Sequence, residues 1–147
     1  MHRILIIDDE PVLRTTFQHL LEEHGHTVRT AADGQEGLSL CKEFRPDLVV
    51  TDIVMPQQDG FATVQELRRQ FRGVPIIVMS GNAGPEQRRL STNMGALFCL
   101  NKPVDYTTLL RLIDNVLSRS SGRFVFGESE GEQRVSEPQA RNNTASD

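Results

Sequence analysis

The sequence predicts an α/β fold in which a five-stranded parallel sheet carries helices on both faces. Two observations support this prediction. Short apolar runs alternate along the chain with longer segments of helical spacing, and three of the runs are apolar throughout. Alternation of strand and helix is typical of parallel sheets. A continuously apolar strand is typical of one that is covered on both faces. Together they predict a doubly wound architecture.

The expected strands are short, and they lie at residues 4–7, 27–31, 48–50, 76–79 and 97–100. The expected helices follow them, at residues 11–24, 35–44, 61–71 and 85–94 and in a last segment after residue 105. Proline near the start of the first helix and glycine after its end match the usual preferences at helix termini. Asp105 is the expected N-cap of the last helix.

Two helices carry more specific expectations. In the first, one face is expected to hold Val12, Leu13, Phe17, Leu20 and Leu21. The helix at residues 85–94 has few clear apolar positions, and they are Leu90 and Met94. Because little apolar surface holds it down, we expect this helix to be among the less firmly held elements of the domain.

Length and charge restrict the class of protein. A chain of 147 residues suits one domain with a substantial core, and a net charge of -4 gives no basic field for nucleic acid. No apolar run approaches the length of a membrane span, and no secretory signal is recognised. The two cysteines, Cys41 and Cys99, favour a reduced, cytoplasmic protein over a disulfide scaffold.

The composition changes near Ser118, where a mostly polar segment begins. We expect a domain at residues 1–119 and a disordered tail at residues 120–147, because such a segment buries too little apolar surface to offset its ordering entropy. The tail contains "GRFVFGE" at residues 122–128. This segment is interpreted as part of the disordered tail, and the alternative is a strand that adds to the sheet edge of a partner.

Polar side chains stand where four of the five expected strands end. Asp8 and Asp9 follow the first strand, Asp52 the third, Ser80 the fourth and Lys102 the fifth. Ligands of open α/β sheets bind beyond the carboxyl ends of the strands. Three crowded carboxylates repel one another and need a cation, and carboxylate oxygens with room for water suit Mg²⁺. With a lysine and a hydroxyl beside it, an aspartate in such a site can accept a phosphoryl group.

Four segments, in this order and spacing, resemble the receiver domain of two-component response regulators. They are "LIIDDE" (5–10), "PDLVVTDIVMPQQDG" (46–60), "VMSG" (78–81) and "NKP" (101–103). The resemblance covers residues 1 to about 117. It implies a flavodoxin-like receiver fold with five helices and the strand order 2-1-3-4-5. It also implies a phosphorylation-dependent signalling switch rather than an enzyme with turnover.

The resemblance assigns a role to each residue at the strand ends. Asp52 is the expected phosphoacceptor, and its donor is a histidine kinase or a histidine phosphotransfer protein. Asp9 is expected to ligate Mg²⁺ directly and Asp8 to hold a metal-bound water. Asp52 itself and the backbone carbonyl of Val54 complete the expected protein ligands of the metal.

The fourth and fifth strands supply the remaining roles that the resemblance implies. Ser80 is expected to hydrogen-bond the phosphoryl group, and Lys102 to pair with Asp52 and then with the phosphate. Gly81 is expected to leave room for the donor imidazole. The Lys102–Pro103 bond is cis in the family.

One position departs from the family pattern. An aromatic residue usually stands three places before the lysine, where this chain has Cys99, and Phe98 stands one place earlier. Successive residues of a strand face opposite sides, so Phe98 does not replace the missing ring. We therefore expect the switch to work through Ser80, the loop at residues 81–84 and the helix that follows it.

Three alternatives accompany this interpretation. Asp8, Asp9 and Glu10 precede a helix, so they can be explained as capping residues. A Mg²⁺-dependent phosphatase with an aspartate nucleophile is a second alternative. It is disfavoured because Val54, two residues after Asp52, cannot act as a general acid. A pseudo-receiver that binds partners without accepting phosphate is the third. It is disfavoured because the acidic residues and the lysine are all present.

Val54 also leads to an expectation for the lifetime of a phosphoryl group on Asp52. Val54 offers no acid–base help to an attacking water, so we expect a phosphoryl group on Asp52 to be lost slowly. The half-life of the purified phosphoprotein, followed by intact mass, checks this. A half-life below a few seconds contradicts it.

Output is expected through binding to another protein or through a phosphorelay. About thirty residues follow Leu117, too few for a helix-turn-helix output module. Arg88, Arg89 and Arg111 lie on the fourth and fifth expected helices. In the family this surface often meets partners or a second receiver, so it is a candidate surface for docking or for phosphorylation-dependent dimerisation. A solvated face is the alternative.

Overall fold

The computed structural model of the protein describes residues 1–55, 58–81 and 84–118. Its main sheet has five parallel strands in the order β2-β1-β3-β6-β7. They are β1 (Arg3–Ile7), β2 (Thr27–Ala31), β3 (Leu48–Asp52), β6 (Ile76–Ser80) and β7 (Phe98–Asn101). In chain order this is 2-1-3-4-5, so the expected topology is confirmed.

A short antiparallel pair that was not predicted follows β3. It consists of β4 (Val54–Met55) and β5 (Gln58–Asp59), in which Val54 pairs with Asp59. The pair lies between the end of β3 and the helix that follows it in the chain.

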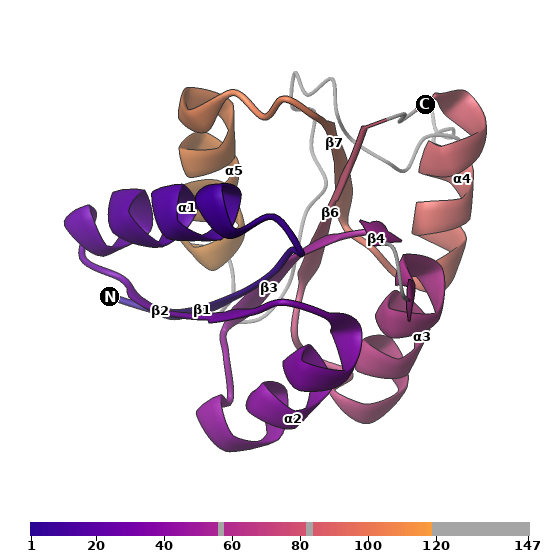
Figure 1. Ribbon diagram of the computed structural model, residues 1–147, viewed down its shortest axis with the longest axis horizontal. Coiled ribbons are helices and arrows are strands. Elements are labelled where there is room, and N and C mark those ends of the chain that lie inside the picture. The colour runs from indigo at the N-terminus through magenta and orange to yellow at the C-terminus, as the bar shows by residue number, and fades with distance from the viewer. Residues whose placement is uncertain (56–57, 82–83, 119–147) are drawn as a thin grey trace, which may run out of the picture.

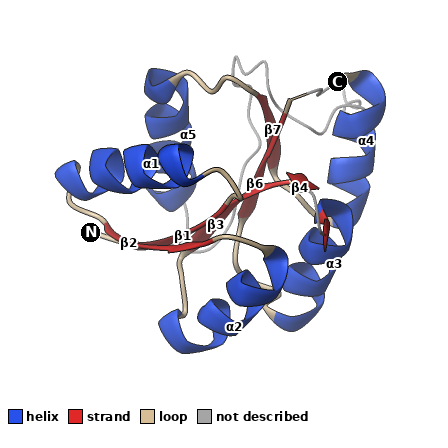
Figure 2. Cartoon of the chain, viewed as in Figure 1, coloured by secondary structure: helices blue, strands red, loops and turns tan. Residues whose placement is uncertain are grey.

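Helices cover both faces of the sheet. They are α1 (Pro11–Glu23), α2 (Gly34–Phe44), α3 (Gly60–Gln70), α4 (Pro85–Met94) and α5 (Tyr106–Ser118). Figure 1 shows α1 and α5 on one face and α2, α3 and α4 on the other, and Figure 2 shows the strands as the layer between them. Within the described residues, no helix is both long enough and apolar enough to cross a membrane.

The core lies on both sides of the central strands. Every residue of β3 and β6 is buried, as their apolar runs predicted. From one face α1 and α5 add side chains such as Phe17 and Ile113, and from the other α2 and α3 add side chains such as Cys41 and Leu67. This packing fixes the strand ends in place.

The expected apolar face of α1 is wrong at one residue. Phe17 and Leu21 are buried, Leu13 packs against the core and Leu20 is half-buried, but Val12 is 77% exposed. A helix turns by about 100° per residue, so Val12 lies roughly 140° around the axis from Phe17. It therefore faces away from the sheet.

Asp105 caps α5, as predicted. Its Oδ1 accepts the backbone N–H of Thr107 at 3.2 Å, and its Oδ2 accepts the hydroxyl of Thr108 at 2.9 Å. These bonds satisfy polar groups in the first turn, which has no intrahelical partner for its amides. The cap fixes the start of α5 close to the end of β7.

The α4 helix contributes little to the apolar core. Leu90 is 36% exposed and Met94 is only partly buried. The end of the helix is held by Arg68 of α3, whose guanidinium donates to the carbonyls of Val74 at 3.0 Å and Gly95 at 3.2 Å. That α4 is among the less firmly held elements of the domain stays a prediction. The bond from Arg68 to Gly95 anchors the C-terminal end of the helix.

Gly60 is expected to tolerate no side chain. It begins α3, and a Cβ added there would overlap the backbone of Ile53, the residue after Asp52. We expect Gly60→Ala to lower the free energy of unfolding by about 1–3 kcal/mol because backbone must shift to make room. Urea denaturation measures this. Gly73→Ala is the control because an added Cβ there meets nothing within 4 Å, and an equal loss in both variants would contradict the explanation.

Candidate functional site

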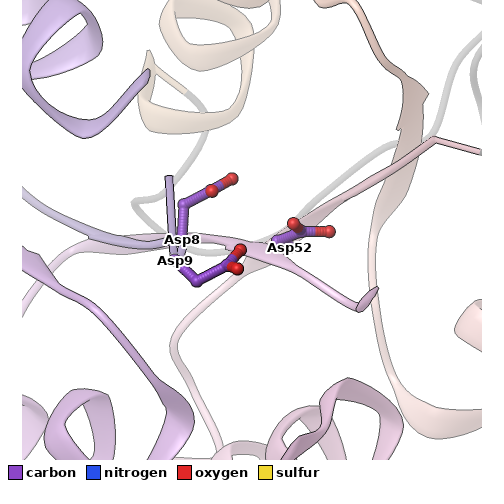
Figure 3. A group of neighbouring side chains, drawn as sticks. All are labelled: Asp8, Asp9 and Asp52. Carbon is purple, nitrogen blue, oxygen red and sulfur yellow. The ribbon is translucent and has the colours of Figure 1, made fainter. Parts of the chain in front are cut away.

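Three carboxylates converge at the carboxyl edge of the sheet. Asp8 and Asp9 follow β1, and Asp52 ends β3. Ile7 pairs with Thr51 in the parallel register, which sets Asp8 and Asp52 side by side on neighbouring strands. One oxygen from each of the three residues lies within 4.8 Å of the others. Figure 3 shows the three side chains at this edge.

Lys102 supplies the positive charge of the site. Its Nζ lies 3.0 Å from Oδ2 of Asp52, 3.0 Å from Oδ2 of Asp8 and 3.5 Å from Oε1 of Glu10. The lysine follows β7, an edge strand of the sheet that is separated from β3 by β6. Its side chain crosses to β3 and β1, and it is only 16% exposed.

Asp8 is held in an unfavourable environment for a charge. The residue is fully buried, and its Oδ1 accepts the backbone N–H of Glu10 at 2.9 Å. Its Oδ2 accepts no aligned hydrogen bond from the described residues, and the contact with Lys102 is an ion pair. Burial raises the pKa of Asp8 despite the Glu10 amide and Lys102, and the charge of Asp52 raises it further.

The surroundings of Lys102 favour its charged form, whereas burial disfavours the charged form of Asp8. Burial alone would lower the pKa of its ammonium group, but the ion pairs with Asp52 and Asp8 outweigh burial and raise the pKa. The lysine is therefore charged at neutral pH. One ammonium group facing three aspartates leaves the site with excess negative charge, which a cation can neutralise.

Ser80 ends β6, the strand next to β3, and Gly81 follows it. Asp52 pairs with Met79, so buried Ser80 lies one residue beyond the level of the carboxylate. The carbonyl of Ser80 accepts the backbone N–H of Lys102 at 2.9 Å, which ties the ends of β6 and β7 together. A Cβ at Gly81 would meet nothing within 4 Å, so space is open at that position.

A comparison with known proteins identifies the family. A family model described as the response regulator receiver domain matches residues 4–114. The chain belongs to this receiver family. Protein PilH of Pseudomonas aeruginosa is 37% identical to this receiver domain over 120 residues, which are 80% of this chain and 99% of that protein. Response regulator MprA of Mycolicibacterium vanbaalenii is 34% identical over 127 residues, and the match covers 86% of this chain and 55% of MprA.

Solved structures agree with the receiver family. The chemotaxis protein CheY4 of Vibrio cholerae superposes with a TM-score of 0.75 at 33% identity, covering 79% of this chain and 98% of that chain. A CheY-like receiver domain protein of Methanospirillum hungatei superposes with a TM-score of 0.78 at 30% identity, covering 82% of this chain and 96% of that chain. Both likenesses cover nearly the whole of the described part.

Receiver domains bind Mg²⁺ at an acidic pocket, and the donor set here fits that ion. All three aspartates offer oxygen atoms, which Mg²⁺ prefers, and Asp8 Oδ2 is buried with no aligned hydrogen bond from the described part of the chain. Asp9 and Asp52 are the expected direct ligands of the ion, and these roles stay predictions. Val54 begins β4 two residues after Asp52, and its expected role as a carbonyl ligand stays a prediction.

Cys99 occupies the position where the family usually has an aromatic residue. It is fully buried in β7, and its Sγ lies 4.0 Å from Oγ of Ser91 in α4. Burial raises the pKa of the Cys99 thiol. Phe98 is also buried, one residue away in the strand. The receiver domain thus has a small thiol, rather than a ring, between β7 and α4.

The structure also brings one residue to the site that sequence reasoning missed. For Glu10 the sequence offered only the alternative of helix capping, yet its side chain makes no capping hydrogen bond to α1. It approaches Lys102 instead, across 92 positions of the sequence. The charged run "DDE" was the available signal, but it does not show that the third acid reaches the lysine.

The cis peptide between Lys102 and Pro103 is present, as the resemblance implied. The tail at residues 120–147 and part of the loop at residues 81–84 lie outside the described residues, so the expectations for them stay predictions.

Proposed function

We propose that this chain is a phosphorylation-controlled switch of a two-component or phosphorelay system, with Asp52 as its phosphoacceptor. One observation supports this above all: a single ammonium group, Lys102 Nζ, bridges Asp52 and Asp8 at 3.0 Å each, inside a cluster of three aspartates. This arrangement leaves negative charge for a metal and a fixed positive charge for a phosphoryl group. The donor is a histidine kinase or a histidine phosphotransfer protein.

The chemistry follows from the residues present. A carboxylate oxygen of Asp52 attacks the phosphorus of the donor phosphohistidine, and an O–P bond forms as the P–N bond breaks. The electron pair of that bond returns to the imidazole nitrogen, and the product is an acyl phosphate. Lys102 stabilises the negative charge of the transferring group, and Ser80 donates its hydroxyl to a phosphoryl oxygen. Asp9, Asp52 and the carbonyl of Val54 would hold Mg²⁺, and Asp8 would hold one of its waters. When bound, the ion would further neutralise the charge of the transferring group.

The output is protein binding. Arg89 and Arg111 are exposed on α4 and α5, the helices that flank the edge strand β7 from the two faces of the sheet (Figure 1). This edge of the domain therefore offers positive charge to an acidic partner or to a second copy of the chain. Ser80 and the start of α4 connect the phosphoacceptor to that edge. We place the protein in the cytoplasm, supported by two buried cysteines that form no disulfide.

Acetyl phosphate with Mg²⁺ tests this function. We expect wild type to gain one phosphoryl group per chain by intact mass and Asp52→Asn to gain none, because the amide is not a nucleophile. Asp114→Asn, an exposed position on α5, is the matched control and should be labelled like wild type. A wild type that stays unlabelled supports a pseudo-receiver, and rapid turnover of varied phosphate esters supports a phosphatase.

A further inference from the structure

Glu10 stands at the solvent side of the lysine. Among the three carboxylates in contact with Lys102, Asp8 and Asp52 are almost entirely buried, whereas the Glu10 side chain is 58% exposed. Glu10 is the N-cap residue of α1 but makes no side-chain capping bond, so helix capping does not explain its orientation. Its Oε1 lies 3.5 Å from Lys102 Nζ.

We propose that Glu10 is a specificity-determining residue that selects phosphodonors by their charge and disfavours small polyanionic donors. The inference rests on the proposed phosphorylation of Asp52. A phosphoryl group that approaches Asp52 from solvent is attracted by the positive charge of Lys102. The negative charge of Glu10, 3.5 Å from Lys102 Nζ, partly offsets that positive charge. The carboxylate also repels each negative charge of the donor, so a dianion is penalised more than a monoanion.

The exposure of the Glu10 side chain limits the size of its effect on the phosphorylation rate. An exposed charge within a Debye length of ~8 Å acts through solvent, so its repulsion is modest and sensitive to salt. We expect the loss of the Glu10 charge to accelerate phosphorylation by a dianionic donor about threefold and by a monoanionic donor less. A protein donor that brings a positively charged side chain to Glu10 does not experience this penalty.

A competing explanation is that Glu10 only complements the dipole of α1. A negative charge at a helix N-terminus is favourable, and removing it would lower the melting temperature of the domain. That role would leave the relative rates with different donors unchanged. The ratio of two rate constants therefore separates donor selection from a structural role.

The experiment compares acetyl phosphate, a dianion at neutral pH, with phosphoramidate, which carries one negative charge less. Rate constants for labelling of the full chain are measured with saturating Mg²⁺ at low and high ionic strength. For Glu10→Gln, we expect the acetyl phosphate rate to rise about threefold and the phosphoramidate rate to rise less, with both gains shrinking in high salt. Glu10→Asp keeps the charge and should keep the wild-type ratio. Glu43→Gln removes the same charge from an exposed position near the far end of α2 and should change neither rate.

The outcomes are distinct. Equal changes with both donors, or a changed ratio in Glu43→Gln, would overturn the inference and leave the proposed function intact. A wild type that neither donor labels would overturn the proposed function and this inference with it. An unchanged melting temperature in Glu10→Gln together with an altered donor ratio supports donor selection by charge.

Discussion

Replacement of Lys102 by methionine is expected to slow the phosphorylation of Asp52 by about 10²-fold, the usual cost of removing one group that stabilises transition-state charge. Lys102 Nζ is the positively charged atom 3.0 Å from both Asp52 and Asp8. Without it, the transferring phosphoryl group meets a cluster of carboxylates and loses its fixed protein cation. Methionine preserves most of the side-chain length, so packing around the stem is retained.

The rate constant for labelling by acetyl phosphate at saturating Mg²⁺ measures this effect. Saturation separates the role of the lysine in the transfer from any change in metal affinity. The sequence offers a matched control, because its other lysine, Lys42, lies exposed in the last turn of α2. Lys42→Met should react at the wild-type rate. A Lys102→Met rate within a factor of a few of wild type would show that the lysine is not needed for the transfer.

Mg²⁺ is expected to stabilise the wild-type fold, and Asp9→Asn to remove most of that stabilisation. An ion that binds the folded state raises the free energy of unfolding by RT ln(1 + [L]/Kd), which is about 1.4 kcal/mol at ten times the Kd. Asp9 contributes one of the three clustered carboxylates. Losing a charged oxygen ligand weakens the site for a hard cation.

Thermal melts with and without Mg²⁺ measure this difference for each variant. Asp114→Asn removes an exposed carboxylate from α5, so its melting temperature should rise with Mg²⁺ as in wild type. If Asp9→Asn responded to Mg²⁺ as strongly as wild type, the assignment of Asp9 as a ligand would be wrong. Because the melt needs no phosphodonor, it tests the metal site separately from the chemistry.

The main elements could be predicted because their signals are local. The runs that became β3 and β6 are apolar throughout, and both strands are buried on both faces. Asp8, Asp9, Asp52 and Lys102 could be proposed together because parallel strands bring their carboxyl ends to one edge. The structure then supplied what the sequence lacks, namely that Lys102 contacts two of these aspartates at 3.0 Å.

Other features had no local signal. The β4–β5 pair has two residues in each strand, too few for a detectable periodicity. The exposure of Val12 depends on how α1 is rotated against the sheet, which an apolar residue type alone does not fix. The contact between Glu10 and Lys102 joins residues 92 positions apart, and a simple capping role already explained the acid. Each of these depends on tertiary placement.

Cys99 is the feature in which this receiver domain differs most clearly from the family pattern. The residue is buried, and its Sγ lies 4.0 Å from Oγ of Ser91 in α4. A thiol has no ring to rotate between a buried and an exposed position. We therefore expect any signal from Asp52 to reach α4 through Ser80 and the backbone that follows it.

Asp52 is the residue that we propose to carry the phosphoryl group. Borohydride reduces an aspartyl phosphate to homoserine, so reduction of the labelled protein followed by peptide mass spectrometry locates the modified residue. We expect homoserine at position 52 after treatment with acetyl phosphate and Mg²⁺, and none in a sample treated without the donor. Homoserine at position 8 or 9, or none in the whole chain, would contradict it.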